Sequence, residues 1–201
     1  MNKELLIIFT KNPELGKCKT RLAATIGDQA ALTVYEQLLD YTVDFTKELK
    51  LTKRVYYSHR VNENDRWPNN IFEKKEQCEG DLGKKMLDAF KTGFEHGFTK
   101  IAIIGSDCAE INGEDITIAF EVLEHNQVVI GPAIDGGYYL LGMNTLIPDL
   151  FSKKSWSTEK LMGETIQTLE EKQINYALLE EKSDIDFEDD LRRKGYINFQ
   201  Y

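Results

Sequence analysis

The sequence predicts an α/β fold, a mostly parallel mixed sheet flanked by helices. Short apolar runs alternate along the chain with longer segments in which apolar residues recur every three or four positions, the patterns of buried strands and amphipathic helices. The run Ile101–Ile104 is apolar throughout, as in a parallel strand covered on both faces. The chain has 201 residues and no repeat or linker, so we expect residues 1–201 to form one domain.

Apolar periodicity and turn residues place the elements of the first part of the chain. Pro13 and Gly16 mark a loop after the first strand, and Asp81 is placed to cap a helix that starts beside it. In chain order, we expect a strand over Leu5–Thr10, a long helix from Asp28, strands over Arg54–Ser58 and near Ile71, and the helix that begins within Gly80–Gly83.

The same signals continue in the second part of the chain. Asp135-Gly136-Gly137 between two apolar arms is typical of a β-hairpin turn, which makes the sheet mixed in direction there. In chain order, we expect strand Ile101–Ile104, helix Gly113–His125, strand Gln127–Ile130 and its hairpin partner, a turn or short helix at Pro148–Phe151, a helix capped by Ser157 or Thr158, strand Asn175–Leu179 and a terminal helix after Ser183–Leu191.

Composition excludes several classes of partner and chemistry. The net charge of −9 argues against a nucleic-acid partner, which needs a basic face. No apolar stretch approaches the roughly 18 residues of a membrane-spanning helix, and the N-terminus lacks the features of a signal peptide, so we expect a cytoplasmic protein. The three cysteines and three histidines are scattered without metal-ligand spacing, which favours free thiols and disfavours a histidine-centred mechanism.

One cationic cluster stands out in this acidic chain. The segment from Lys11 to Arg21 carries four cations and one acid, a local charge of +3, directly after the first strand. It is either a solvated loop or an anion-binding loop, and its place beside a strand end favours anion binding. It is not a P-loop, because Cys18 follows Gly16-Lys17 where a P-loop has Ser or Thr, and no dinucleotide-binding glycine pattern occurs in the chain.

Several residues are candidates for a site, and each has a structural alternative. Asp107 follows a buried strand, where ligands of α/β sheets collect, although Asp often caps a turn or helix there. Asp81 is a cap or a ligand contact, with capping the simpler interpretation. Asp135 with Gly136 and Gly137 forms a hairpin turn or a turn that a ligand approaches closely. The Trp156 ring either stacks on a sugar or base of the ligand, or packs half-buried against the protein.

Taken together in order, four motifs resemble a known bacterial family. The chain is similar to glycosyltransferases associated with radical-SAM and selenodomain proteins and with arsenosugar biosynthesis, in the nucleotide-diphospho-sugar transferase (GT-A) superfamily. The resemblance covers nearly the whole length and departs from the family pattern at Ala109 and at Phe187-Glu188. The motifs are Lys11-x-Pro13-x-x-Gly16-x-x-Lys19-Thr20-Arg21-Leu22, Gly105-Ser106-Asp107-Cys108, Asp135-Gly136-Gly137-Tyr138-Tyr139 and Asp184-Ile185-Asp186.

The resemblance implies a role for each matching residue. Asp107 and Asp186 are the implied metal ligands, and Asp184 is a further candidate. The implied nucleotide-binding residues are Lys11, Gly16, Lys19, Arg21 and Asp81. On the acceptor or sugar side the matching residues are Asp135, Gly136, Gly137 and Trp156, and Asp135 is the candidate to orient or deprotonate an acceptor hydroxyl. The cofactor would be Mg²⁺ or Mn²⁺, which suit oxygen ligands.

These residues would support transfer chemistry on a nucleotide. A metal bridging phosphates to Asp107 and Asp186 stabilises the charge that builds on a leaving nucleoside diphosphate, and Lys19 and Arg21 add further positive charge. We therefore expect a glycosyltransferase that moves a sugar from a nucleotide sugar to a small-molecule acceptor. A nucleotidyltransferase that uses a nucleoside triphosphate and releases pyrophosphate is the alternative, and a non-catalytic nucleotide-binding protein is a third. Base, sugar, acceptor, stereochemistry and oligomeric state stay open.

Overall fold

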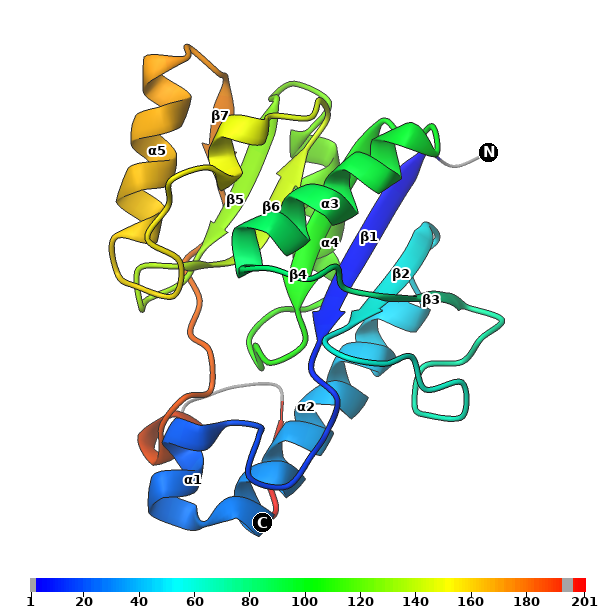
Figure 1. Cartoon of the computed structure of the whole chain (residues 1–201), viewed down its shortest axis with the longest axis vertical. Helices are drawn as coiled ribbons and strands as arrows, with labels where there is room; N and C mark the ends of the chain where they lie inside the picture. Colours follow the sequence, from blue (N-terminus) through cyan, green and yellow to red (C-terminus); the bar gives the residue numbers. More distant parts are fainter. Residues whose placement is uncertain (1–2, 193–196) are drawn as a thin grey trace.

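A computed structural model, which describes residues 3–192 and 197–201, confirms the predicted α/β fold. Seven strands form one sheet in the order β3-β2-β1-β4-β6-β5-β7 (Figure 1). The strands are β1 (Glu4–Thr10), β2 (Thr52–Tyr57), β3 (Phe72–Glu76), β4 (Lys100–Gly105), β5 (Val128–Pro132), β6 (Tyr138–Met143) and β7 (Tyr176–Leu178). All neighbouring pairs are parallel except those that β6 makes with β4 and β5. The expected mixed direction at the hairpin is therefore confirmed.

Helices cover both faces of this sheet. The helices are α1 (Thr20–Ile26), α2 (Asp28–Lys47), α3 (Leu82–Glu95), α4 (Gly113–Val122) and α5 (Leu161–Glu171), with 3-10 turns η1 (Pro148–Phe151) and η2 (Glu188–Arg192). In β1, Leu6 and Ile8 belong to the core under α2 and α4, whereas Leu5 and Ile7 belong to the core under α3 and α5. The period of two along a buried strand thus builds one apolar core on each side of the sheet.

A third, smaller core joins the start of the chain to its end. Leu22 of α1 packs with residues of α2, with Ala109 after β4 and with Ile185 before η2. Figure 1 shows α1 and the C-terminal segment lying together beyond the carboxyl end of β1. This core brings the cationic segment, the residues after β4 and the Asp184-Ile185-Asp186 motif to one edge of the sheet.

Two local predictions need correction. The cationic segment is not a loop throughout, because α1 begins at Thr20 and places Thr20 and Arg21 in its first turn. Neither Ser157 nor Thr158 is the N-cap of α5; that position is Lys160, which makes no side-chain capping bond. The terminal helix expected after Leu191 falls on residues 193–196, which lie outside the described residues; the last described element is the 3-10 turn η2. The Asp81 cap of α3 is confirmed, since its carboxylate accepts from the Lys84 N–H.

No helix within the described part of the chain has the length and apolar character needed to cross a membrane.

Candidate active site

Two adjoining cavities open at the carboxyl ends of the strands, and each has a volume of about 390 Å³. We call the first the aspartate side; it is lined by Lys11, Lys19, Thr20, Arg21, Leu82, Asp107, Asp135, Gly137, Tyr138, Ser157, Leu161, Asp184 and Asp186. We call the second the lysine side; it is lined by Phe9, Thr10, Lys11, Tyr35, Ser58, Gln77, Leu82, Lys85, Gly105, Ser106, Asp107 and Ser157. Because ligands of open α/β sheets bind at this edge, the two cavities form the candidate site.

The centre of the aspartate side is the Lys19 side chain, which is 4% exposed. Its ammonium donates to Asp107 Oδ2 at 2.8 Å and lies 3.6 Å from Asp186 Oδ1, and Arg21 binds the other oxygen of Asp186 at 2.9 Å. Burial by itself would lower the pKa of Lys19, but the nearby carboxylates, Asp107 first, hold it above its usual value. Lys19 is therefore a fixed cation between two carboxylates from distant parts of the chain.

The backbone at Lys19 directs this side chain into the site. Lys19 has φ 48° and ψ 49°, a left-handed conformation that is uncommon outside glycine. It lies at the N-cap position of α1, after the turn that closes with the Lys17 N–H donating to the Glu14 carbonyl. Strained backbone of this kind concentrates at functional sites, where the surrounding structure maintains it.

Gly105 makes room for the Asp107 carboxylate. A Cβ added at Gly105 would lie 2.9 Å from Asp107 Oδ1, so the carboxylate lies over the glycine at the end of β4. Burial by itself would raise the pKa of Asp107, but the Lys19 ammonium outweighs it and holds that pKa below its usual value. Asp107 is thus an anion in the folded protein, oriented by its neighbour two residues earlier.

Hydrogen bonds along the sheet edge deliver Asp184 and Asp186 to Asp107. The segment after β7 continues beside β5, where the Lys182 N–H donates to the Pro132 carbonyl and the Ile134 N–H donates to the Lys182 carbonyl. Next to it, the Ser183 N–H donates to the carboxylate of Glu110, which follows β4. Residues separated by more than seventy positions in the sequence therefore meet at one edge.

Asp190 fixes the backbone of Asp186. One oxygen of the buried Asp190 carboxylate accepts from the N–H groups of both Asp186 and Phe187, at 3.0 and 2.8 Å. This contact fixes the backbone of the segment that carries Asp186.

The hairpin turn brings Asp135 and Gly137 into the aspartate side. Asp135 Oδ1 accepts from the Gly137 N–H at 2.9 Å, so one carboxylate oxygen holds the turn. Gly136 has φ 85°, and a Cβ there would lie 2.4 Å from the Glu159 carbonyl oxygen, so this turn packs directly on the segment before α5. Burial, the Asp107 carboxylate and Asp135 together raise the pKa of Asp184 well above its usual value.

The floor of the lysine side is a group of buried hydroxyls. Ser106 donates to Thr10 at 3.2 Å, and the Tyr35 hydroxyl of α2 lies 3.3 Å from Thr10 Oγ1. The Lys11 N–H donates to the Tyr35 oxygen at 2.9 Å, and that hydroxyl is also 3.1 Å from the Lys11 carbonyl, to which it can donate. At the far end, Gln77 donates its amide to the Tyr56 carbonyl at 3.0 Å. These contacts fix where the cationic segment leaves β1.

The structure brings together most, not all, of the predicted site residues. Lys11, Lys19, Arg21, Asp107, Asp135, Gly137 and Asp186 line the aspartate side. Gly16, Asp81, Gly136 and Trp156 do not line either cavity. Asp81 is engaged as the cap of α3, and a Cβ at Gly83 would lie 2.5 Å from the Trp156 indole, so the half-buried Trp156 packs on α3.

Sequence reasoning missed several residues of the site. Lys85 and Ser157 line it, Tyr35 supports it, and Asp190 holds Asp186. Lys85 lies two residues after the Gly80–Gly83 motif, and that spacing is a usable signal. Ser157 has φ 62°, a left-handed conformation that no local sequence pattern predicts.

The carboxylate oxygens of the aspartate side suit a hard divalent cation in their chemistry. Asp107 and Asp186 converge on one positive group, the Lys19 ammonium, and burial together with the Asp107 carboxylate raises the pKa of the neighbouring Asp184 carboxyl. Among residues 3–192 and 197–201, however, no group of three or more His, Cys, Asp or Glu side chains is arranged to hold a metal ion. The two carboxylates that converge, Asp107 and Asp186, nevertheless supply the oxygen ligands that Mg²⁺ and Mn²⁺ prefer.

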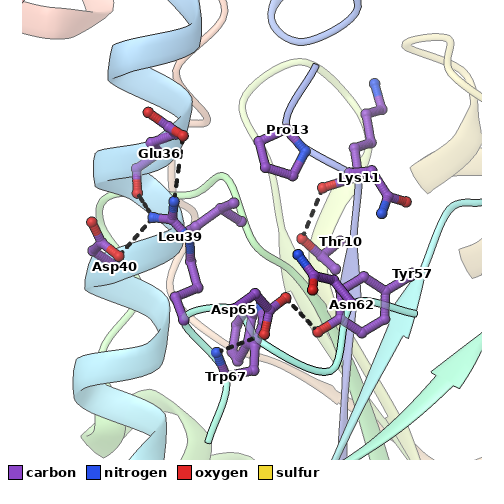
Figure 2. Close-up of a pocket in the computed structure, with 12 residues that line it drawn as sticks. Thr10, Lys11, Pro13, Glu36, Leu39, Asp40, Tyr57, Asn62, Asp65 and Trp67 are labelled. Atoms are coloured by element: carbon purple, nitrogen blue, oxygen red, sulfur yellow. Dashed lines mark hydrogen bonds and ion pairs between the residues drawn. The ribbon is translucent and has the colours of Figure 1, made fainter. Parts of the chain in front are cut away.

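A further cavity of about 330 Å³ lies beside α2, and Figure 2 shows it. Apart from Lys11, its charged residues are paired within a local network. Arg66 binds Asp40 at 2.6 Å and lies 3.6 Å from Glu36, and Asp65 accepts from Tyr57 and from Lys74. This pattern indicates a structural network that ties the segment before β3 to α2.

Comparison with known proteins supplies a family. Residues 42–158 match the family described as "Uncharacterized protein conserved in bacteria (DUF2064)". No curated protein matches the chain in sequence.

Solved structures share the fold. A provisionally named nucleotide-diphospho-sugar transferase from Desulfovibrio desulfuricans G20 is 27% identical, with a TM-score of 0.87 over 93% of this chain and 84% of that one. A cytidylyltransferase from Leptospira borgpetersenii is 14% identical (TM-score 0.54, 92% and 77% covered). A CMP:2-keto-3-deoxy-manno-octonic acid synthetase complexed with CTP is 10% identical (TM-score 0.54, 95% and 96% covered). The predicted nucleotide-diphospho-sugar transferase fold is confirmed.

Proposed function

The chain belongs to the DUF2064 family of bacterial proteins, and from that premise we propose that it is a metal-dependent glycosyltransferase that uses a nucleotide sugar. The observation that carries the proposal is the convergence of Asp107 and Asp186 on Lys19, with Arg21 beside them. Carboxylates and cations gathered at one point suit a metal–diphosphate group, whose charge grows as the glycosidic bond breaks. The likeness to the Desulfovibrio desulfuricans G20 transferase supports the same class of substrate.

Each residue has a role in this proposal. Asp107 and Asp186 would hold Mg²⁺ or Mn²⁺, which supplies Lewis-acid stabilisation of the leaving diphosphate. Asp184 lies in the same cavity as a further carboxylate. Lys19 and Arg21 bind diphosphate oxygens, Lys19 as a point charge and Arg21 as a planar fork.

Asp135 is the group that would orient or deprotonate the acceptor. It lies in the same cavity as Asp107, and one of its oxygens is engaged by the Gly137 N–H, which leaves the other for an acceptor hydroxyl. Tyr138 and Leu161 give this cavity an apolar wall. We propose a small-molecule acceptor that enters beside the hairpin turn.

Nucleotidyl transfer is the second candidate. The likeness to two enzymes named for cytidylyl or CMP transfer favours it, since the fold is shared along most of each chain. In that reaction a nucleoside triphosphate donates its nucleotidyl group and pyrophosphate leaves, and the same cations and carboxylates would serve. The third possibility, a nucleotide-binding protein without turnover, predicts ligand binding and no product.

A product assay separates these reactions. The purified protein is incubated with Mg²⁺ or Mn²⁺, a panel of nucleotide sugars or nucleoside triphosphates, and a mixture of small hydroxylated acceptors. We expect nucleoside diphosphate from one nucleotide sugar, and no pyrophosphate from any triphosphate. Release of pyrophosphate would replace the first reaction by the second.

Binding is tested first by thermal shift with the same panel, with and without Mn²⁺. We expect metal-dependent stabilisation by at least one nucleotide sugar. Absence of any stabilisation, or stabilisation that is unchanged in Asp107→Ala, contradicts the proposed site. The association with radical-SAM proteins and arsenosugars and the cytoplasmic location stay predictions.

A further inference from the structure

We propose that the lysine side binds a phosphoryl group between the ammonium groups of Lys11 and Lys85, without a divalent cation. The inference rests on the proposed function in its choice of ligand and goes beyond it by adding a second, metal-independent anion subsite to the cleft. The observation behind it is that Lys19 and Arg21 are bound to carboxylates, whereas Lys85 and Lys11, which lines both cavities, are not.

The cations of the lysine side are unpaired. Within residues 3–192 and 197–201, neither the Lys11 nor the Lys85 ammonium makes a hydrogen bond or ion pair, although both residues line the cavity. Figure 2 shows the Lys11 side chain extending away from Asp65 and Trp67, so it does not join the network beside α2. By contrast, Lys19 and Arg21 are both bound to carboxylates.

The balance of charge differs between the two sides. The aspartate side has three cations, Lys11, Lys19 and Arg21, against four carboxylates. The lysine side has two cations and one carboxylate, Asp107, which Lys19 binds directly and on which the charge of Lys11 also acts. In a chain of net charge −9, the lysine side is a local positive region that faces no unpaired acid.

The surroundings of Lys85 favour an anion as well. Lys85 lies in the first turn of α3, and Leu82, the first residue of that helix, also lines the cavity, so the helix N-terminus that Asp81 caps lies beside it. The floor below it consists of the Thr10, Tyr35 and Ser106 hydroxyls, which are neutral donors and acceptors. A cavity of about 390 Å³ is within the range that takes a nucleoside monophosphate or a sugar phosphate.

The neighbouring lysine provides a matched control. Lys84 is exposed, lines neither cavity, and packs its chain against Gly80, where an added Cβ would lie 2.6 Å from Lys84 Cδ. Lys84→Gln and Lys85→Gln remove the same charge one residue apart. A general effect of net charge would weaken anion binding equally in both variants, whereas a specific contact would affect only Lys85→Gln.

The test is calorimetric titration in EDTA with AMP, CMP, GMP, UMP and glucose 1-phosphate. We expect at least one of these to bind wild type, about tenfold weaker binding to Lys85→Gln, and near wild-type binding to Lys84→Gln and Lys85→Arg. Added salt should reduce the difference between wild type and Lys85→Gln. Binding of a nucleotide assigns the phosphoryl group to the donor, and binding of glucose 1-phosphate alone assigns it to the acceptor.

Two results would overturn the inference. In the first, EDTA abolishes binding of all five probes while Mg²⁺ restores it; in the second, Lys85→Gln and wild type bind the same probe equally. Both leave the proposed metal site intact. If glucose 1-phosphate binds in a Lys85-dependent manner while no nucleotide or nucleotide sugar binds with or without metal, the inference stands and the proposed function fails.

Discussion

The two halves of the cleft share Lys11, Leu82, Asp107 and Ser157, yet they hold their cations differently. On the aspartate side Lys19 and Arg21 are bound to carboxylates, and Lys19 is almost fully enclosed. On the lysine side Lys11 and Lys85 have no ion-pair partner among the residues described. A ligand that binds Asp107, Asp186, Lys19 or Arg21 must exchange with existing ion pairs, whereas a ligand that binds Lys11 and Lys85 does not.

The two sides therefore differ in the free energy that a ligand must spend on breaking existing ion pairs. Separating Asp107 from the Lys19 ammonium requires another cation for the carboxylate and another anion for the lysine. A metal together with a phosphate supplies both at once, so we expect the two to bind the aspartate side cooperatively. The lysine side needs no such exchange, and its affinity should depend on salt rather than on metal.

The change Asp107→Asn should have the largest effect. It removes a charge that faces Lys19 and, in the proposal, one of two metal ligands, while the amide keeps the size of the side chain. We expect a loss of roughly 100-fold or more in turnover and loss of the metal-dependent thermal shift. Binding of phosphate probes in EDTA should be retained.

Asp44→Asn is the matched control, because Asp44 is an exposed residue of α2 that pairs with Lys47 away from the cleft. It should leave turnover and metal response unchanged. Equal losses in both variants would argue that net charge, and not the place of Asp107, governs the aspartate side.

Gly105→Ala should disturb the aspartate side with little effect on folding. The added methyl would meet Asp107 Oδ1, which is the end of a flexible side chain, so the carboxylate turns away while the strand stays intact. We expect roughly tenfold lower turnover with the free energy of unfolding changed by less than about 1 kcal/mol. Steady-state kinetics and urea denaturation measure the two quantities.

Gly163→Ala gives the comparison for that variant. Gly163 lies in α5 with no atom within 4 Å of an added Cβ, so alanine should stabilise the helix by about 0.5–1 kcal/mol and leave turnover unchanged. If Gly105→Ala is as active as Gly163→Ala, the position of the Asp107 carboxylate does not limit the reaction.

The sequence predicted the sheet well because its signals are local. Ile101–Ile104 is uniformly apolar and Asp81 precedes a regular helical pattern, and the structure has a strand and a capped helix there. The helix α1 escaped prediction because its seven residues begin at Thr20 directly after a loop, and its N-cap Lys19 has a left-handed backbone with no signature in the sequence. Short elements set by tertiary contacts have weak local patterns.

Site residues were predicted from the sequence only where they belong to a motif. Asp107 and Asp186 were named from their motifs, and the structure brings both to Lys19. Lys85 was missed because a lysine on a helix is usually solvated, and Asp190 was missed among several acids of the same segment. Which of several acids accepts two backbone N–H groups depends on the folded path of the chain.

Asp190→Ala should have a moderate effect confined to the aspartate side. It removes the acceptor that two N–H groups share, so the segment carrying Asp186 loses its fixed position. We expect a few-fold to tenfold loss of metal affinity and a loss of about 1–3 kcal/mol in stability. Metal titration followed by thermal shift measures both.

Asp189→Ala is the control for this change, since the Asp189 side chain is 95% exposed one residue earlier. It should resemble wild type in both measurements. Probe binding in EDTA should be the same for both variants, because neither residue lines the lysine side.

Tyr35→Phe should have the smallest effect on function and should act on the lysine side. The hydroxyl accepts from the Lys11 N–H inside the protein, and its removal leaves that N–H without this acceptor, which costs about 1–3 kcal/mol of stability. Phosphate-probe binding in EDTA should weaken about twofold to threefold, because the backbone that directs Lys11 becomes less well fixed. Metal affinity should not change, since Asp107, Asp186 and Lys19 keep their contacts. A loss of metal affinity equal to the loss of probe binding would mean that the two sides respond as one unit, which contradicts the division of the cleft into a paired and an unpaired half.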